Sequence, residues 1–205
     1  MTTYRSINLK DILNNKRLGE KVAKQLLSHF SCPYNPDVEH FLKNSAIEFT
    51  KQGISSTYLI MAISDNKYIL VGYFTLANKT FCFDANSISS RTLQRRLLKF
   101  SQYEKNIQRH FISAPLIGQL GKNFYNSYEN LIDGSKLLKF ALGKVQQAQH
   151  IIGGKIVFLE CENKPKLLDF YAKHEFFNFG FSELEPGRIR KAIKKPLIQM
   201  LKYIR

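Results

Sequence analysis

The sequence lacks several features that would indicate a membrane, secreted or metal-binding protein. It has no tryptophan, and its three cysteines (Cys32, Cys82 and Cys161) form no C-x-x-C pair, which argues against a disulfide framework and a cysteine zinc site. No apolar run approaches the roughly 18–20 residues that span a bilayer, and the first thirty residues contain no apolar signal-peptide core. We therefore expect a cytoplasmic protein with no membrane partner.

Motifs for common catalytic chemistry are also missing. The five histidines are scattered and show neither H-x-x-x-H nor H-E-x-x-H spacing, so we expect no metal site. The sequence contains no G-x-S-x-G elbow and no Walker A loop. Glu160 and Glu162 alternate along the end of a predicted strand, which favours a solvated rim over acid–base catalysis. Hydrolase and kinase functions therefore have no supporting residues.

Acidic residues are few compared with basic ones. The chain of 205 residues has 31 Lys and Arg against 16 Asp and Glu, a formal net charge of +15. Such an excess predicts a polyanionic partner, namely nucleic acid, an anionic membrane surface or a phosphate-rich ligand. A basic proteome with lysine-rich solvated faces would give the same total charge.

The positive charge is concentrated in two segments. Residues 88–110 contain six cations against one acid, and residues 186–205 contain seven cations and no acid. Because clustered cations suit a phosphate backbone, we expect nucleic-acid contacts in both segments. The predicted contacts are Arg91, Arg95, Arg96, Lys99, Arg188, Arg190, Lys191, Lys194 and Lys195.

The last twenty residues predict a basic amphipathic helix. Apolar residues recur at three- to four-residue spacing from Ile189 to Ile204, and Pro196 would bend or split the helix. The apolar face is weak and has no tryptophan, so a phosphate backbone suits this helix better than a membrane surface. We accordingly expect a domain at residues 1–185 and a helical tail at residues 186–205.

Hydrophobic periodicity and turn residues predict an α/β domain. The expected order is two helices, an antiparallel hairpin, a strand, a helix, a strand, a helix and a strand, with one β-α-β crossover. The predicted helices span about 11–31, 37–46, 134–149 and 164–173, and the predicted strands span 57–63, 68–76, 115–120, 156–161 and 176–181.

The start of the helix at residue 134 is a candidate anion site. Asp133, Gly134 and Ser135 open this helix shortly after a strand, and the free backbone N–H groups of a helix N-terminus attract phosphate. Gly134 would permit a phosphate to approach closely. Many crossover helices begin in the same way.

The second half of the chain resembles the GCN5-related N-acetyltransferase superfamily. The resemblance lies in LIGQL (116–120), DGSKLLKFAL (133–142) and GGKIVFLECENKPKLLDFYAKHEF (153–176). Gly134-Ser-Lys-Leu-Leu is similar to the family's Gly-x-x-Leu-Leu, and 170–176 is similar to Phe-Tyr-x-x-x-Gly-Phe with Glu175 replacing the glycine. Residues 32–58 resemble the opening of one branch, the toxins that acetylate aminoacyl-tRNA.

The resemblance implies a fold and a site. The fold would be a mixed central sheet, splayed between the strands at 115–120 and 155–161, with flanking helices and acetyl-CoA in the cleft. Tyr171 would protonate the departing thiolate, and a backbone N–H of Leu120 or Gly121 would stabilise the oxyanion. The implied partners are acetyl-CoA and an aminoacyl-tRNA, with a homodimer as a further expectation. The implied cofactor-binding residues are Gln119, Leu120, Gly121, Lys122, Ile132, Asp133, Gly134, Ser135 and Lys136.

The loop that would hold the pyrophosphate departs from the family pattern. Aligned on Leu137-Leu138, it reads Ser127-Tyr-Glu-Asn-Leu-Ile132, which matches none of the three signature positions. Backbone N–H groups, which any residue supplies, do most phosphate binding. Two alternatives stay open beside the aminoacyl-tRNA acetyltransferase: an N-acetyltransferase for small molecules or proteins, and a catalytically inactive member of the fold that binds nucleic acid.

Overall fold

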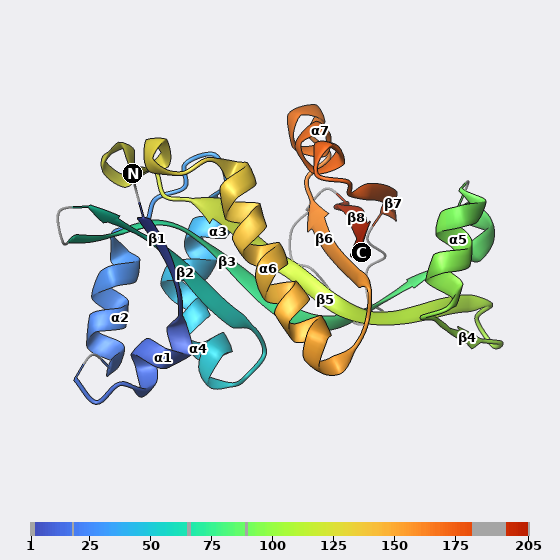
Figure 1. The fold of residues 1–205 in the computed structure, drawn as a ribbon, viewed down its shortest axis with the longest axis horizontal. Coiled ribbons are helices and arrows are strands. Elements are labelled where there is room, and N and C mark those ends of the chain that lie inside the picture. Colours follow the sequence, from blue (N-terminus) through green and yellow to red (C-terminus); the bar gives the residue numbers. More distant parts are fainter. Residues whose placement is uncertain (1–2, 18, 65–66, 89, 182–195, 205) are drawn as a thin grey trace. The chain divides into compact units, whose positions relative to one another are not determined.

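The structure is a computed structural model that describes residues 3–17, 19–64, 67–88, 90–181 and 196–204 (Figure 1). It divides into two compact units, one of residues 1–77 and 117–147, the other of residues 78–116 and 148–205. Because strands β3 and β5 and helix α6 contribute to both units, each unit is assembled from segments far apart in the sequence.

The first unit contains most of the helices. In chain order its elements are β1 (Thr3–Asn8), α1 (Leu9–Asn14), α2 (Gly19–Ser28), α3 (Pro36–His40), the π-helical turn η1 (Phe41–Ser45), α4 (Ala46–Lys51), β2 (Ser56–Ser64), the start of β3 (Lys67–Phe83), the end of β5 (Arg109–Lys122), the 3-10 segment η3 (Tyr125–Leu131) and most of α6 (Gly134–Ile152).

The second unit contains the rest of the sheet and two shorter helices. Its elements are the end of β3, the 3-10 turn η2 (Ala85–Ser87), α5 (Arg91–Leu98), β4 (Gln102–Glu104), the start of β5, the end of α6, β6 (Ile156–Cys161), α7 (Pro165–Lys173), β7 (Phe177–Phe181) and β8 (Ile198–Tyr203).

The strands form one mixed sheet. Within the described residues its eight strands follow the order β1-β2-β3-β5-β6-β8-β7, and β4 pairs with β5 outside this path. The pairs β1–β2, β2–β3, β4–β5, β6–β8 and β7–β8 are antiparallel. The mixed sheet with flanking helices that the sequence predicts is confirmed. The splay between the strands at 115–120 and 155–161 stays a prediction.

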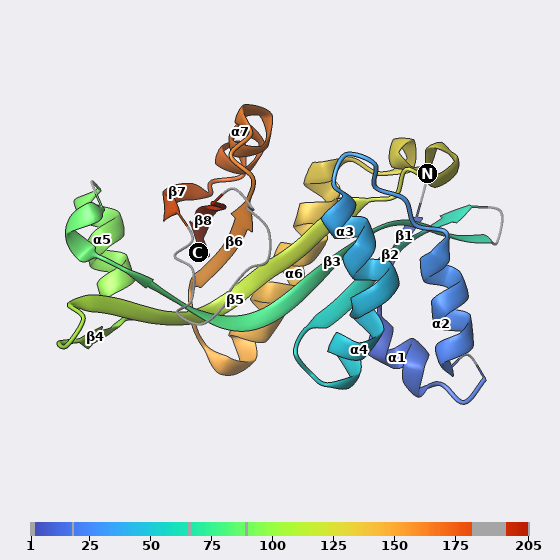
Figure 2. The ribbon, with the colours of Figure 1, turned by 180° about the vertical axis from the view of Figure 1, so that it is seen from behind.

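In the first unit, helices cover both faces of the sheet. Helices α1 to α4 lie on one face and α6 lies on the other (Figures 1 and 2). Because side chains alternate along a strand, successive β2 residues face opposite layers. The buried core beneath α1 to α4 includes Leu9, Ala23, Leu27, Phe30, Val38, Leu42, Ala46, Leu59, Met61 and Tyr73.

The close fit of α6 on the sheet depends on Gly72 in β3. A Cβ atom at this position would lie 3.3 Å from the Leu137 methyl groups of α6 and 2.9 Å from the Gly121 carbonyl oxygen. On the same face the Tyr58 and Phe74 rings stack, and Lys144 of α6 lies 5.5 Å from the Tyr58 ring centroid. Gly72 thus brings the end of β5 and the first turn of α6 together.

The predicted helical tail is wrong for the residues that the structure describes. Ile198–Tyr203 forms strand β8, which pairs with β6 on one side and β7 on the other. Its first four residues are all buried, and a short apolar run of this kind does not distinguish a strand from a helix. The expected boundary at residue 186 lies outside the described residues.

Other elements are incompletely predicted from the sequence. Strand β3 continues to Phe83 instead of ending near residue 76, and β5 begins at Arg109 instead of near residue 115. Residues 78–80 of β3 are exposed, so this part of the strand has no apolar alternation to reveal it. Strands β1 and β4 are not predicted.

Candidate functional site

Helix α6 begins at Gly134, as the sequence predicts. Asp133 caps it: its carboxylate Oδ1 accepts a hydrogen bond from the Lys136 backbone N–H at 2.6 Å, and its carbonyl oxygen accepts one from Leu137 N at 3.1 Å. The carboxylate therefore occupies one of the N–H groups that a helix N-terminus offers to an anion. It also places a negative charge at the predicted phosphate site.

The backbone N–H groups of Gly134 and Ser135 remain for a ligand. No hydrogen bond from either group occurs among the described residues, as expected for the first turn of a helix. The Lys136 ammonium lies 5.5 Å from the centroid of the Tyr4 ring. A phosphate would thus meet two free donors and one nearby cation, opposed by the Asp133 carboxylate.

The loop before α6 takes its left-handed turns earlier than the positions at which the family pattern has glycine. Asn126 and Ser127 have positive φ angles of 48° and 59°, so the left-handed residues of this loop precede the positions at which the family pattern has glycine. Ile132 is extended and its side chain is 3 % exposed. Ile132 could therefore serve a ligand only through its backbone. The Tyr4 hydroxyl donates to the Leu131 carbonyl and ties this loop to β1.

The end of β5 packs closely against the N-terminal helices. A Cβ atom at Gly121 would lie 2.5 Å from Val38 Cγ1, so packing alone requires a glycine there. Gln119 and Leu120 are half-buried. The Lys122 ammonium donates to the Glu129 carbonyl oxygen at 3.1 Å and so connects β5 to the loop before α6. The structure thus brings the two sets of predicted cofactor residues to neighbouring positions in one unit.

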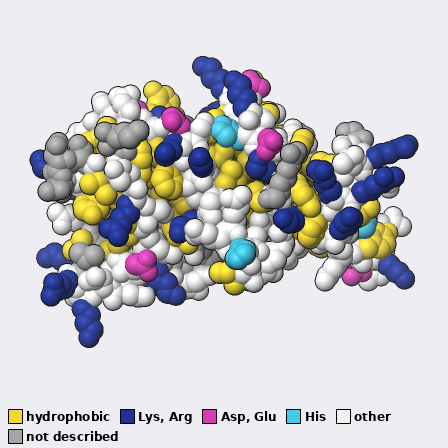
Figure 3. All heavy atoms as spheres, viewed as in Figure 1, with side chains coloured by type: hydrophobic (Ala, Val, Ile, Leu, Met, Phe, Trp, Pro, Cys, Tyr) yellow, Lys and Arg dark blue, Asp and Glu magenta, His cyan; other side chains and the backbone are white. Residues whose placement is uncertain are grey.

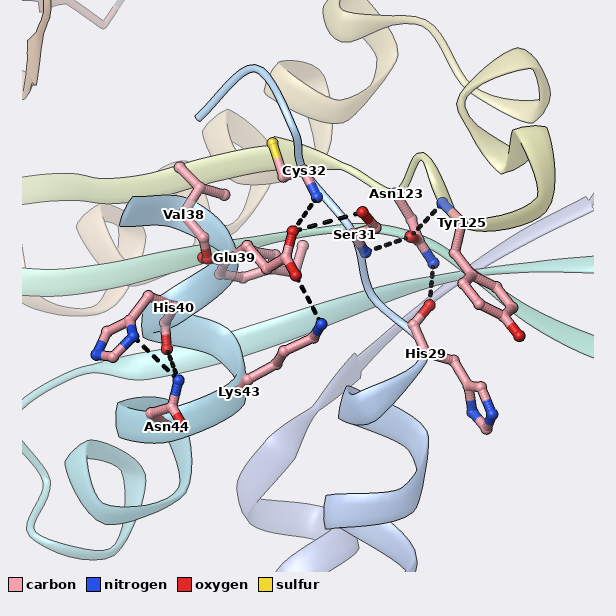
Figure 4. Close-up of polar contacts among 11 residues, drawn as sticks. His29, Ser31, Cys32, Val38, Glu39, His40, Lys43, Asn44, Asn123 and Tyr125 are labelled. Atoms are coloured by element: carbon pink, nitrogen blue, oxygen red, sulfur yellow. Dashed lines mark hydrogen bonds and ion pairs between the residues drawn. The ribbon is translucent and has the colours of Figure 1, made fainter. Parts of the chain in front are cut away.

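Asn123, which directly follows β5, is a central residue that sequence reasoning missed. It is 0 % exposed. Its side-chain amide donates to the His29 carbonyl oxygen, and its Oδ1 accepts from the backbone N–H groups of Ser31 and Tyr125 (Figure 4). The amide also donates to the Leu70 carbonyl oxygen. One side chain therefore joins the segment after α2, strand β3 and the loop that leads to α6.

We expect Asn123→Ala to lower the free energy of unfolding by about 3 kcal/mol, because it leaves several buried backbone groups without partners. Chemical denaturation monitored by circular dichroism measures this change. The matched control is Asn44→Ala, since Asn44 is exposed and its side chain bonds to His40, four residues earlier; it should cost about 0.5 kcal/mol or less. Equal losses in the two variants would contradict the structural role of Asn123.

A groove lies next to the segment that Asn123 contacts, and its polar side chains pair with one another. It has a volume of about 380 Å³. Glu39 accepts hydrogen bonds from Lys43 Nζ at 2.6 Å and from Cys32 N at 2.7 Å (Figure 4), and these two contacts lower the pKa of its carboxyl group. A carboxylate with a lowered pKa is a weak general base. The lining residues are Cys32, Pro33, Pro36, Glu39, His40, Lys43 and Asn44.

In the second unit, Tyr171 lies in the last turn of α7 and is 7 % exposed. Its ring contacts Phe170 and Phe176 at centroid distances of 5.1 and 5.7 Å. Burial raises the pKa of the Tyr171 phenol, and the neighbouring Cys161 adds to this shift. The phenol therefore keeps its proton at neutral pH, as a proton donor requires.

The residue that replaces the motif's glycine adopts a glycine-like conformation. Glu175 has a φ of +63°. The N–H of Phe176 donates to the Tyr171 carbonyl at 3.1 Å, and the N–H of Glu175 donates to the Ala172 carbonyl at 2.9 Å; these two bonds close α7 in a Schellman motif. Lys202 of β8 pairs with the Glu175 carboxylate at 2.6 Å. Glu175 thus adopts the left-handed conformation that commonly ends a helix at a glycine.

Helix α5 carries the predicted nucleic-acid contacts that the structure describes. The side chain of Ser90 caps it, Leu97 is fully buried, and Arg91, Arg95 and Lys99 are exposed. Arg96 differs, since its guanidinium lies 5.0 Å from the Tyr203 ring centroid and packs on β8. Figure 3 shows Lys and Arg side chains gathered over α5. Outside the described residues lie the remaining predicted contacts, Arg188, Arg190, Lys191, Lys194 and Lys195.

Two further features can be stated for the part of the chain that the structure describes. It contains no cluster of three or more His, Cys, Asp or Glu side chains that could hold a metal ion. It also contains no helix long and apolar enough to cross a membrane.

Comparison with known proteins finds matches among solved structures. No protein-family model matches the chain, and neither does any curated protein sequence. The structure of AtaT complexed with acetyl-methionyl-tRNAfMet matches 98 % of this chain and 95 % of its own length, with a TM-score of 0.63 and 16 % identity. AtaT is a toxin, and this chain shares its fold, the GCN5-related acetyltransferase fold.

A second toxin, KacT, shows the same similarity. Its tyrosine-to-phenylalanine variant matches 97 % of this chain and 93 % of its own, with a TM-score of 0.58 and 17 % identity. A tyrosine-to-phenylalanine variant of AtaT, bound to acetyl-CoA and the C-terminus of the antitoxin AtaR, matches 98 % of this chain with a TM-score of 0.58 and 15 % identity. The toxin fold extends over nearly the whole chain, including regions that show no resemblance in sequence.

Proposed function

We propose that this protein transfers the acetyl group of acetyl-CoA to the α-amino group of an aminoacyl-tRNA in the cytoplasm. The observation that carries the proposal is the near full-length match to AtaT, whose structure was determined with acetyl-methionyl-tRNAfMet. The concentration of exposed cations on α5 supports it, because this substrate arrives on a polyanion.

Residues at the start of α6 would hold the pyrophosphate of acetyl-CoA, the cosubstrate that supplies an acetyl group activated as a thioester. The free N–H groups of Gly134 and Ser135 would donate to phosphate oxygens, and Lys136 would add a positive charge. At the end of β5, a backbone N–H of Leu120 or Gly121 would donate to the thioester carbonyl oxygen as negative charge develops on it.

Tyr171 would supply the proton that the departing thiolate takes up. Its phenol is buried and its pKa is raised, so the proton is present at the start of each turnover.

The acceptor amine needs little help from a base. A free α-amino group has a pKa near 8, and esterification of the carboxylate lowers it further, so much of it is neutral at physiological pH. Glu39 of the first unit already accepts hydrogen bonds from Lys43 and Cys32 N. It is therefore a poor candidate for a general base, which agrees with a reaction that needs none. Acyl transfer to such an amine therefore requires an oxyanion donor and an acid, but no strong base: the nitrogen would lose its extra proton to water, and Tyr171 would regain a proton from water before the next turnover.

Incubation with radiolabelled acetyl-CoA and total tRNA tests this proposal. With aminoacylated tRNA, label should appear in the RNA fraction and should be released by mild alkali, which cleaves the aminoacyl ester. With deacylated tRNA, no label should appear. Equal labelling of both tRNA samples, or labelling of neither, would contradict the proposal.

A second candidate is a catalytically inactive member of the fold that binds nucleic acid. The observation that favours it is the Asp133 carboxylate, which already occupies an N–H group at the start of α6. The solved KacTA–DNA complex, which matches this chain with a TM-score of 0.56 and 16 % identity, adds that a related assembly contacts DNA. Acetyl-CoA binding separates this candidate from the enzyme.

The substitution Asp133→Asn is expected to strengthen acetyl-CoA binding about fivefold. Asparagine retains the cap but removes a negative charge that would repel the pyrophosphate, and a repulsion of about 1 kcal/mol corresponds to this ratio. Isothermal titration calorimetry measures the affinity. Asp11→Asn is the matched control, since Asp11 lies exposed in the first turn of α1. Unchanged affinity in Asp133→Asn would place the pyrophosphate elsewhere.

A further inference from the structure

Three aromatic rings form a row across neighbouring strands of the second unit. Tyr103 of β4 is directly opposite His110 of β5, and their ring centroids are 4.8 Å apart. The His110 ring stacks on Phe83 of β3, with a centroid distance of 5.5 Å and an interplanar angle of 24°. The hydroxyl of Ser101 is 3.0 Å from His110 Nδ1 and fixes that ring. Phe83 and Ser101 therefore hold the His110 ring in place behind Tyr103.

This row lies on the sheet face that α5 covers. Ile112, Ala114 and Phe83 share one buried cluster with Leu97 of α5, and residues two apart in β5 point to the same face. His110 therefore faces α5, and Tyr103, its directly opposed partner, does too. Phe83 is 4 % exposed whereas Tyr103 is 52 % exposed. The row thus runs from the core outward and ends in an open ring at the sheet edge.

Exposed cations accompany the open ring. Arg91 and Arg95 of α5, Lys99 at its C-terminal cap and Lys105 of the β4–β5 turn are exposed, and within the described residues none of them has an ion-pair partner. The acid of this segment, Glu104, accepts a hydrogen bond from Asn106 N in the turn. Tyr103 belongs to the same basic segment and lies between Lys99 and Lys105 in the sequence. An exposed aromatic ring in a segment of unpaired cations suits a ligand that has both flat faces and negative charges.

We propose that Tyr103, supported by His110 and Phe83, is a stacking platform for an unpaired nucleotide of the bound RNA. The cations of α5 would hold the adjoining phosphates. Every base offers a flat face to an aromatic ring, and such stacking contributes strongly to the binding of unpaired strands. In a continuous duplex the bases are stacked on one another, and a ring at a sheet edge would reach only the backbone. This proposal rests on the proposed function and specifies its substrate: the RNA presents an unpaired segment to this end of the second unit.

The test compares the affinities of the full-length protein for a short unpaired RNA and for an RNA duplex of equal charge. Tyr103→Ala should weaken binding of the unpaired RNA by about five- to a hundredfold, the usual range for losing one base stack. Binding of the duplex should change less than twofold, and Tyr103→Phe should restore the unpaired affinity. Tyr68→Ala is the matched control, because Tyr68 is also an exposed strand tyrosine, 52 % exposed; its affinities should equal those of the wild type.

A 2-aminopurine in the unpaired RNA gives a direct readout of stacking. Its fluorescence should be quenched on binding to the wild type and much less on binding to Tyr103→Ala. Unchanged affinity and quenching in Tyr103→Ala would overturn the proposal, and equal losses for both RNAs would overturn it too. The assay contains no acetyl-CoA, so its result can be interpreted even if the protein has no acetyltransferase activity.

Discussion

Replacing Tyr171 with phenylalanine should lower kcat by about ten- to a thousandfold, the usual effect of removing a positioned acid. The ring stays in place among Phe170 and Phe176, so the fold and the affinity for acetyl-CoA should change little. Steady-state kinetics with aminoacyl-tRNA and calorimetry with acetyl-CoA measure the two quantities separately. The control is Tyr68→Phe, whose kcat should equal that of the wild type.

The pH dependence of kcat gives a second measurement of the same role. Because burial raises the pKa of Tyr171, its phenol should stay protonated to at least about pH 10, where an ordinary tyrosine begins to ionise. The acceptor amine loses its proton as the pH rises towards about 8, so kcat/KM should increase and then stay level. An unchanged kcat in Tyr171→Phe, or a loss of kcat between about pH 7 and 9, would assign the acid to another group.

Removing three cations from α5 should weaken tRNA binding and make it less dependent on salt. Each phosphate contact contributes roughly 0.7–0.9 to the slope of log affinity against log salt. The triple variant Arg91→Ala, Arg95→Ala and Lys99→Ala should therefore flatten this slope by about two units and raise KM for aminoacyl-tRNA, while acetyl-CoA binding persists. Arg96 is left in place because it packs on Tyr203.

The matched control removes three exposed lysines from the first unit, namely Lys10, Lys16 and Lys21. It changes the net charge equally but leaves α5 intact. A protein that is merely basic would show the same slope in both triple variants, and this outcome would contradict a specific role of α5. Filter binding over a range of salt concentrations provides the comparison.

The site could be predicted where local sequence determines local structure. The Asp-Gly-Ser sequence followed by Leu137-Leu138 predicted the start of α6, since capping and helical periodicity are local properties. The residues around Tyr171 were recognisable despite Glu175, because Phe170, Tyr171 and Phe176 keep the spacing of the motif. The structure adds that Glu175 has a positive φ.

Features built from distant segments could not be predicted in this way. Asn123 bonds to His29 and Leu70, which are 94 and 53 residues away, and a single asparagine in a turn-rich stretch carries no sign of such partners. Gly121 was predicted as a cofactor contact and a possible oxyanion donor, whereas its close approach to Val38 gives it a packing role as well. Strand β8 differs from the predicted helix because its first four residues are all buried, which removes the alternation that identifies a strand, and because its partners β6 and β7 lie elsewhere in the sequence.

The most direct measurement identifies the acetylated product. Aminoacylated total tRNA is incubated with the protein and acetyl-CoA, the aminoacyl esters are cleaved with mild alkali, and the released amino acids are analysed by mass spectrometry. We predict at least one amino acid that carries an acetyl group on its α-nitrogen, and we predict much less of it with Tyr171→Phe. Release of unmodified amino acids alone, at protein concentrations that bind both acetyl-CoA and tRNA, would contradict the proposed acetyl transfer.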